Sequence, residues 1–300
     1  ARESLIVPMD GLLRLDSLGD LYPVAASLAL VDEQLAGIPY ALEVRHTVYR
    51  QTLFADPPNS FDLVLDSPTP YNFFIGPPSG VNQVTLLQYL AAGGRLTDEE
   101  GAPMIDANVL TSVLSFYSAA REAGTIDPAF FQYADTAEVW TLYRDGRINL
   151  ADVSSTLYLT ERDQVRSTGL TWAPTPTGEP FALARSWSWV MVTRDPERQQ
   201  AALALLSFLM EPANQGAYTY SAHYLPSQRD ALAVWGQGDP YVPFATTLLD
   251  HAQPLPEAAV LAAVGPPMQD AVESVMLNRI APVQAALTAA QVLNPPESTP

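Results

Sequence analysis

The sequence predicts an α/β fold, in which strands and helices follow one another along a single chain. Short extended stretches are separated by segments whose apolar residues recur at helical spacing. The composition is that of a folded globular protein, since 48% of the residues are hydrophobic and 16% are charged. A chain of 300 residues is long enough for two domains or for one large α/β unit.

The clearest predicted helix covers residues 106–124. Val109 and Val113 begin a series of apolar residues that lies on one helix face. Asp106 is a suitable N-terminal cap because its side chain can accept backbone N–H groups, and Gly124 suits the left-handed residue that ends many helices. The segment is therefore expected to be a helix with both ends fixed by its own sequence.

A second helix is expected to begin after Asp195, where Pro196 occupies the first helical position. Pro212 is expected to stop that helix, because proline lacks the N–H that helix continuation needs. Helical spacing predicts three further helices, at 81–91, 264–280 and 282–293. Two extended pieces are expected at 37–44 and 46–50.

The stretch RSWSWVMVT, residues 185–193, is predicted to be a strand that carries two tryptophans. Alternate residues of a strand share a face, so Arg185, Trp187 and Trp189 are expected on the same side. Two indoles and a guanidinium on one face suit either core packing or a wall against which a ligand stacks. Alternation alone leaves this choice open.

The composition argues against several functions. The formal net charge is −18, and a chain so acidic repels phosphate backbones, so no nucleic-acid partner is expected. The absence of cysteine excludes disulfides, zinc–thiolate sites and cysteine nucleophiles, and no cofactor is predicted. No window reaches the roughly 18 uninterrupted apolar residues of a membrane span. The first residues lack the features of a signal peptide, and removal of a leader before Ala1 is left open.

Nothing in the sequence positively indicates catalysis, and we expect no enzyme activity. The three histidines, at 46, 223 and 251, lie too far apart for the local spacing of a metal site, so no metal is predicted. Phosphate-binding glycine loops and nucleophile motifs are missing from the sequence. The acidic run 98–100 is expected to be a solvated charge run beside Gly101.

Several blocks of sequence resemble, in the same order, those of family 1 extracellular solute-binding proteins, the maltose-binding-protein group of ABC importers. The early block is EQLAGIPYALEVRHTVYRQTLF, in which Arg50 and Gln51 replace the usual Asn-Lys. The later blocks are FYSAAREAGTIDP, WTLYRDGRINLADVSSTLY, APTPTGEP, SWSWVMVTRDPERQQAALALLSFLMEPANQ, YLPSQRDAL and RIAPVQAALTAAQVLN. Each block is loose by itself, but their shared order covers nearly the whole chain.

Two departures from the family pattern matter. The strand–helix–strand–helix region that opens the family has no counterpart before Ala1, and the family's helix after residues 57–61 is largely missing. The first lobe is therefore expected to be reduced, or else the chain is the later part of a longer precursor.

The resemblance implies a two-lobed, type II periplasmic-binding-protein-like fold with hinge strands, and a ligand held between the lobes. It assigns residues 1–42 and 184–240 to an incomplete first lobe, and 43–183 and 241–300 to the second. Ligand that contacts both lobes only when they close would stabilise closure. The implied ligand is a sugar or oligosaccharide, and the implied partners are the permease subunits of an ABC transporter. A monomer at the cell surface or in the periplasm, with or without a lipid anchor, is expected.

The resemblance also implies where the ligand contacts lie, since sugars bind to aromatic platforms and to charged hydrogen-bonding groups. Glu43 matches a glutamate of a hinge strand, and Tyr158 replaces a family tryptophan. Arg185 and Ser186 replace two glycines before Trp187, which matches a position that is often aromatic near the cleft. We therefore expect Arg185 and Trp187 to face a ligand and Trp189 to belong to the core. The expected ligand-binding residues are Glu43, Arg45, His46, Tyr71, Asn72, Phe73, Tyr158, Arg185, Trp187 and Tyr224.

Two other functions stay open at this point. A carbohydrate-active enzyme with a similar cleft would turn its ligand over, whereas a binding protein would not. A ligand-sensing ectodomain would belong to a longer precursor with a transmembrane segment. Arg185 also leaves an acidic ligand open, because a guanidinium pairs with carboxylates in two-point fashion.

Overall fold

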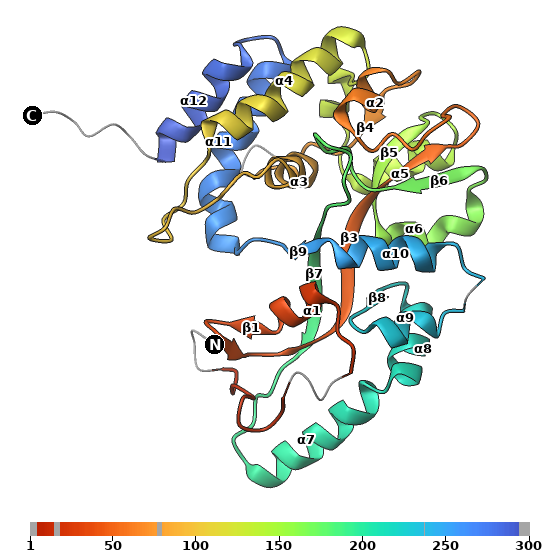
Figure 1. The fold of residues 1–300 in the computed structure, drawn as a ribbon, viewed down its shortest axis with the longest axis vertical. Helices are drawn as coiled ribbons and strands as arrows, with labels where there is room; N and C mark the ends of the chain where they lie inside the picture. Colours follow the sequence, from red (N-terminus) through yellow and green to blue (C-terminus); the bar gives the residue numbers. More distant parts are fainter. Residues whose placement is uncertain (1–4, 15–18, 77–79, 237, 294–300) are drawn as a thin grey trace, which may run out of the picture. The chain divides into compact units, whose positions relative to one another are not determined.

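The computed structural model describes residues 5–14, 19–76, 80–236 and 238–293 (Figure 1). The chain forms two compact units, each built from three separate stretches. Unit 1 comprises residues 1–45, 154–162 and 182–255. Unit 2 comprises residues 46–153, 163–181 and 256–300.

The units share most residues of the two expected lobes, but their boundaries differ. Residues 43–45, 154–162, 182–183 and 241–255, which the resemblance assigns to the second lobe, belong to unit 1 by their contacts. The units are defined by packing alone. Whether the lobes that close on a ligand follow the same boundaries stays a prediction.

Unit 1 contains several strands, of which the longest, β3, is shared with unit 2, and helices that alternate with these strands along the chain. Its elements are α1 (Pro23–Leu28), β1 (Leu30–Val31), β2 (Gln34–Leu35), the first part of β3 (Ile38–Arg50), α6 (Ser155–Glu161), β7 (Ala182–Trp189), α7 (Pro196–Leu209), α8 (Pro212–Ala222), β8 (Leu225–Pro226), α9 (Arg229–Ala233), α10 (Tyr241–Asp250) and β9 (Ala252–Pro254).

The long strand β3 replaces the two extended pieces that the sequence predicts. It runs without a break through 13 residues and is buried at every position except 45 and 50, which are half-buried. In unit 1 it pairs antiparallel with β7 and with β8, and β7 pairs in parallel with β9. A strand flanked on both edges has no exposed backbone to interrupt it, which explains why one continuous strand forms.

A core cluster of unit 1 packs the first part of β3 against Met191 and the last turns of α7, where Leu206 is buried. Asp195 caps α7 by accepting the N–H of Arg198 at 3.0 Å, and Pro196 is the first residue of α7, as predicted. The helix ends before Pro212, as predicted, since its last residue is Leu209, but Pro212 also opens a further helix, α8, that was not predicted. A proline at the first helical position loses no hydrogen bond, so it starts a helix as readily as it ends one.

Unit 2 contains the rest of β3 and most of the longer helices. Its elements are α2 (Phe61–Leu65), β4 (Tyr71–Asn72), α3 (Gln83–Ala91), α4 (Ala107–Ala123), the 3-10 helix η2 (Pro128–Gln132), α5 (Thr136–Arg144), β5 (Leu150–Ser154), the 3-10 helix η3 (Arg162–Gln164), β6 (Thr168–Thr171), α11 (Ala258–Met276) and α12 (Pro282–Leu293); β5 and η3 extend by one residue into unit 1.

The sheet of unit 2 is built around the second part of β3. This part pairs antiparallel with β6, while β5 lies next to it and pairs in parallel with β4. Gly169 of β6 lies directly opposite Tyr49, and a Cβ at Gly169 would come within 2.2 Å of the Tyr49 ring. Only glycine therefore allows the tyrosine ring to cover this strand pair.

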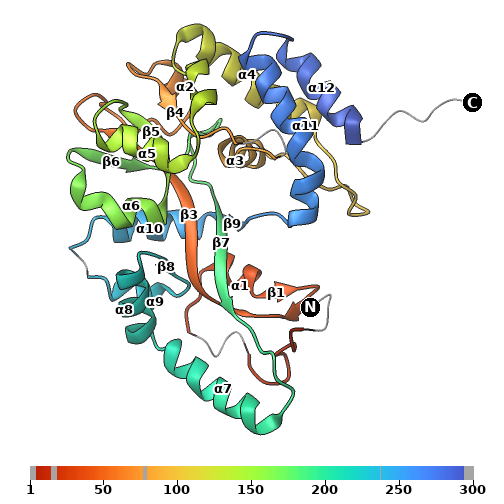
Figure 2. The same ribbon diagram turned by 180° about the vertical axis from the view of Figure 1, so that it is seen from behind.

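Helices α4, α11 and α12 pack side by side on unit 2, as both views show (Figures 1 and 2). The caps predicted for residues 106–124 are confirmed, because Asp106 accepts the N–H groups of Asn108 and Val109, and Gly124 has a φ of 75°. The three other predicted helices are confirmed as α3, α11 and α12. In the part of the chain that the structure describes, no helix has the length and apolar character that crossing a membrane requires.

Candidate functional site

The candidate site of unit 1 begins with the register of β3 against β7. The antiparallel pairing places Glu43 directly opposite Arg185, and Ala41 opposite Trp187. Directly opposed residues on two strands have Cβ atoms about 4.5–5.5 Å apart, so their side chains meet on one face of the sheet. The register therefore joins two predicted site residues that are 142 positions apart in the sequence.

Glu43 and Arg185 form an ion pair on this face. The Arg185 Nε donates to Glu43 Oε2 at 2.5 Å, and Arg185 Nη2 also contacts Oε2. The Glu43 side chain is only 10% exposed, whereas that of Arg185 is 56% exposed. A largely buried carboxylate needs such a partner, and the exposed guanidinium keeps N–H groups for another acceptor.

Trp187 lies beside this ion pair and beside a second ring. The Arg185 guanidinium carbon is 5.4 Å from the centre of the Trp187 ring, which is within cation–π range. The Tyr224 ring lies 4.5 Å from Trp187 on centroids, tilted by 56°. Trp187 nevertheless remains 44% exposed, so the indole presents surface to a ligand.

Tyr224 owes its position to the end of helix α8. His223 ends this helix in a left-handed conformation with a φ of 60°, which turns the chain back toward β8. The Tyr224 N–H then donates to the Thr219 carbonyl at 3.0 Å. This turn brings the ring of Tyr224 against β7.

Tyr158 lies in a second aromatic group of unit 1. Its ring stacks on that of Tyr241 at 5.2 Å with an angle of 26°. Helix α6, which carries Tyr158, is tied to β3 because the Val44 N–H donates to the Ser155 hydroxyl at 3.2 Å. Burial raises the pKa of Tyr241 well above its usual range, with the neighbouring Tyr158 and the charge of Glu43 adding to the effect. Glu43 therefore lies within electrostatic reach of this group.

A two-point ion pair between Arg162 and Asp239 holds the second aromatic group in place. The Nη1 and Nη2 groups of Arg162 donate to the two Asp239 carboxylate oxygens at 2.9 and 2.7 Å. Asp239 also accepts the Tyr241 N–H at 2.9 Å. Burial acts to raise the pKa of Asp239, but these hydrogen bonds and the guanidinium charge outweigh it and hold the pKa below its usual value.

Four other predicted site residues lie in unit 2, and all four are buried: His46, Tyr71, Asn72 and Phe73. Tyr71 and Phe73 pack their rings 5.1 Å apart, and Phe73 also meets Phe130 at 5.1 Å. Asn72 donates to the carbonyls of Pro70 and Leu150. His46 is fully buried in β3, and Arg45, at the last residue of unit 1, is half-buried. Ligand contact by these residues stays a prediction.

The comparison with known families decides the class of the chain. Residues 1–244 match the family described as bacterial extracellular solute-binding protein. The chain belongs to this family. No curated protein matches the chain in sequence.

Solved structures show that this solute-binding chain has the two-lobed α/β fold of periplasmic binding proteins. The cyclic alpha-maltosyl-1,6-maltose binding protein from Arthrobacter globiformis is 19% identical with a TM-score of 0.74, over 96% of this chain and 79% of that one. Maltose-bound MalE3 of T. maritima is 16% identical with a TM-score of 0.76, over 97% and 80%. An ABC transporter solute binding protein from Thermotoga lettingae, bound with alpha-D-tagatose, is 17% identical with a TM-score of 0.69, over 98% and 80%.

The expectation that Trp189 belongs to the core of the solute-binding chain is wrong. Trp189 is 48% exposed and packs edge-on against Tyr40 at 5.8 Å. It lines an apolar groove of unit 1 between the end of β7 and the C-terminal half of α7. The lining residues are Met9, Trp189, Val190, Met191, Ala202, Leu205, Leu206 and Leu209. Apart from the Trp189 indole N–H, these side chains offer no strong hydrogen-bonding group, whereas a sugar needs several.

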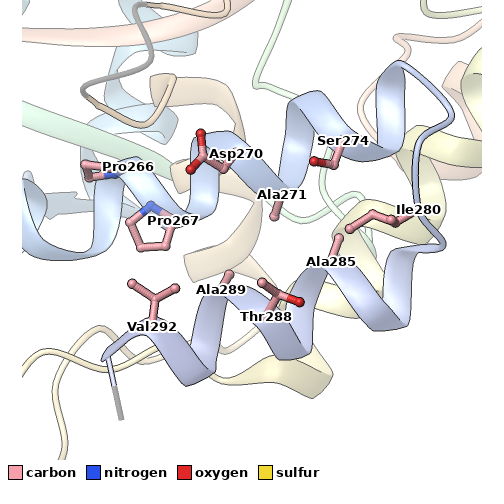
Figure 3. Close-up of a pocket in the computed structure, with 10 residues that line it drawn as sticks. All are labelled: Pro266, Pro267, Asp270, Ala271, Ser274, Ile280, Ala285, Thr288, Ala289 and Val292. Atoms are coloured by element: carbon pink, nitrogen blue, oxygen red, sulfur yellow. The ribbon is translucent and has the colours of Figure 1, made fainter. Parts of the chain in front are cut away.

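A second hollow, of about 180 Å³, lies in unit 2 between α11 and α12 (Figure 3). Pro266 and Pro267 form one end of it, opposite Val292, and Asp270 supplies its single charge. No aromatic ring lines this hollow, so it lacks the platform on which a sugar stacks. The group of Glu43, Arg185, Trp187 and Tyr224 is the better candidate for a solute site.

The sequence analysis missed Tyr241, which belongs to the second aromatic group, and the ion pair of Arg162 and Asp239 beside it. Arg162 and Asp239 are 77 positions apart, and no motif links them. The only local hint is that Asp239 precedes Pro240 and Tyr241, where a carboxylate suits the start of a helix. Among the described residues, no group of three or more histidine and acidic side chains is placed to hold a metal ion.

Proposed function

We propose that this chain is an extracytoplasmic solute-binding protein that captures a carbohydrate and delivers it to the permease of an ABC transporter. Membership of the extracellular solute-binding family supports capture of a solute outside the cytoplasm. The names of the similar structures support a sugar, since they bind maltose, a maltose derivative or tagatose. The Thermotoga protein is itself named as part of an ABC transporter.

The observation that carries the proposal is the group formed by Glu43, Arg185, Trp187 and Tyr224. A sugar ring presents apolar C–H faces and a rim of hydroxyls, so it needs a flat aromatic surface beside charged hydrogen-bonding groups. Trp187 offers exposed indole within this group. The Arg185 guanidinium lies next to it and offers N–H donors to hydroxyl oxygens.

Each residue of this group has a separate role in the proposal. Trp187 stacks on the sugar, and Tyr224 holds the indole from the side. Arg185 donates to ligand hydroxyls, while Glu43 orients the guanidinium through Oε2 and keeps Oε1 as an acceptor. Tyr158, a buried ring that stacks on Tyr241, stays a predicted contact. Arg45, His46, Tyr71, Asn72 and Phe73 stay predicted contacts from the rest of the chain.

A thermal-shift screen of the purified chain tests the proposal. The probes are glucose, galactose, maltose, maltotriose and tagatose, with a polyol and a dipeptide as other solute classes. A true ligand raises Tm progressively with its concentration, because binding to the folded state alone stabilises it by mass action. Shifts with the polyol or the dipeptide alone would contradict a carbohydrate ligand, and consumption of the sugar would indicate an enzyme instead.

Two tryptophans of β7 provide a matched pair of variants. Trp187→Ala is expected to abolish the sugar-dependent shift, because it removes the stacking surface. Trp189→Ala removes an indole of similar exposure from the same strand and is expected to keep the shift. Equal loss of binding in both variants would show that damage to the strand, rather than loss of stacking, is responsible. Delivery is then tested by whether the sugar-loaded chain stimulates ATP hydrolysis by the reconstituted transporter.

A further inference from the structure

The charge of the candidate site in unit 1 is already balanced within the protein. Arg185 lies over the Trp187 ring, and its two polar contacts both go to the carboxylate of Glu43. Glu43 is largely buried and lies directly opposite Arg185 on the neighbouring strand. The pair therefore carries no net charge toward a ligand, although its guanidinium still offers N–H groups.

Two other arginines of unit 1 are also paired with carboxylates. Arg162 is paired at two points with Asp239 beside the second aromatic group. The Nη1 of Arg229 lies 2.5 Å from Asp250 Oδ1, and its Nε lies 3.5 Å from Asp20 Oδ2. These three arginines lend the unit no excess of positive charge, and the whole chain carries a net charge of −18.

We propose that Glu43 is a specificity-determining residue, which neutralises Arg185 so that the site accepts uncharged saccharides and rejects acidic saccharides of the same size. This inference rests on the proposed carbohydrate-binding function and adds a restriction to it. It decides between the neutral and acidic ligands that Arg185 alone leaves open.

The physical reason is that an acidic ligand would bring a second carboxylate to a guanidinium that already pairs with Glu43. The carboxylate of a uronic acid that reached Arg185 would lie close to Glu43, and two like charges at such a distance repel each other. A hydroxymethyl group in the same position accepts a hydrogen bond from Arg185 and donates one to Glu43 without that repulsion. The acidic chain also lowers the local concentration of any anion.

Matched pairs of sugars test the inference, since members of a pair differ only in a hydroxymethyl group or a carboxylate. The probes are glucose with glucuronate, galactose with galacturonate, and galactobiose with digalacturonate, measured by calorimetric titration at low ionic strength. In any pair that binds, the neutral member is expected to bind at least tenfold more tightly. Equal or tighter binding of the acid overturns the inference and leaves the proposed function standing. No binding by any saccharide, including the maltose series, overturns the proposed function itself.

Glu43→Gln assigns the effect to its residue. The amide keeps the size and the acceptor oxygen but removes the charge, so Arg185 gains an unbalanced positive charge. The ratio of acid to neutral affinity is expected to rise at least tenfold. Asp250→Asn is the matched control, because it removes a carboxylate paired with another arginine of unit 1 and changes the net charge equally. An unchanged ratio in Glu43→Gln, or an equal rise in both variants, overturns the assignment.

A measurement on the unaltered chain covers the case in which Glu43→Gln does not fold. Salt screens exposed charges, and the Arg185 side chain is more than half exposed. Raising ionic strength is therefore expected to narrow the gap between the acidic and the neutral sugar by strengthening acid binding. Weaker acid binding at high salt would reveal a net attraction and overturn the inference.

Discussion

The predicted site residues of the two units contrast in what surrounds them. In unit 1, Arg185 and Trp187 are exposed beside an ion pair and a second ring. In unit 2, Tyr71 and Phe73 are buried among other rings. Both groups were predicted to contact a ligand. Arg185 and Trp187 are exposed to solvent, whereas the rings of Tyr71 and Phe73 pack against other rings. A predicted ring is available to a ligand only where its surroundings leave it exposed, and Tyr158 of unit 1, which is 9% exposed, resembles the rings of unit 2 in this respect.

The largest expected effect is the loss of stability in Phe73→Ala. Phe73 has no exposed surface and contacts the rings of Tyr71, Tyr117 and Phe130. Removing a fully buried phenylalanine leaves a cavity, which costs about 3–5 kcal/mol in the free energy of unfolding. Urea denaturation followed by circular dichroism measures this loss. A cost below about 1 kcal/mol would mean that the ring is available to a ligand, and the contrast between the units would fail.

A smaller loss is expected from Asn72→Ala, which tests whether the polar group of this motif is also structural. Asn72 donates to two carbonyls and accepts the Tyr133 hydroxyl at 2.8 Å. Leaving the buried Leu150 carbonyl without this donor costs about 1–3 kcal/mol. Tyr133→Phe removes only one of the three hydrogen bonds and serves as the milder control. If both variants keep full stability and Asn72→Ala alone weakens sugar binding, Asn72 belongs to the site rather than to the fold.

Much of the fold could be predicted because its determinants are local. The caps at Asp106 and Asp195 act on N–H groups two or three residues away, so their sequence neighbourhoods contain the whole interaction. The end of α7 before Pro212 was predicted, but α8 was missed, because the same residue type can end one helix and open the next. Local patterns carry no information on which of these applies.

The site was predictable only where a family motif named the residue. Strand alternation placed Trp187 and Trp189 on one face, but exposure depends on what covers that face, and nothing within the strand specifies it. Trp189 was therefore assigned to the core and is exposed. Arg162 and Asp239 meet only because the fold brings positions 77 apart together, which spacing along the chain does not reveal.

Asp239→Asn tests the ion pair of unit 1 through its dependence on pH. The pKa of Asp239 is lower in the folded chain than its ordinary value of 3.8. A carboxylate with a depressed pKa stabilises the fold fully above its ordinary pKa and loses this contribution as pH falls through the folded value. At pH 6 the variant is expected to melt roughly 2–4 °C lower, the shift that about 1 kcal/mol brings in a large domain.

The difference in Tm between the protein and Asp239→Asn should shrink as pH falls below 4, when the native carboxylate also becomes neutral. Glu99→Gln is the control, because Glu99 is an exposed acid of unit 2. It is expected to leave Tm unchanged at every pH. A difference for Asp239→Asn that stays constant from pH 6 to pH 3 would show that side-chain shape, and not charge, holds Arg162.

The smallest expected effect is that of Trp187→Ala on the stability of the ligand-free chain. Trp187 is partly exposed, and the main contact that the substitution removes is the one with the Tyr224 ring. The free energy of unfolding should therefore fall by about 1 kcal/mol, the contribution of one aromatic pair. Trp140→Ala provides the matched comparison in unit 2, because Trp140 is 1% exposed and its removal should cost about 3–5 kcal/mol. If urea denaturation gives the two variants the same loss, Trp187 is packing rather than platform. The exposed indole would then have no advantage over the buried rings of unit 2 as a surface for sugar.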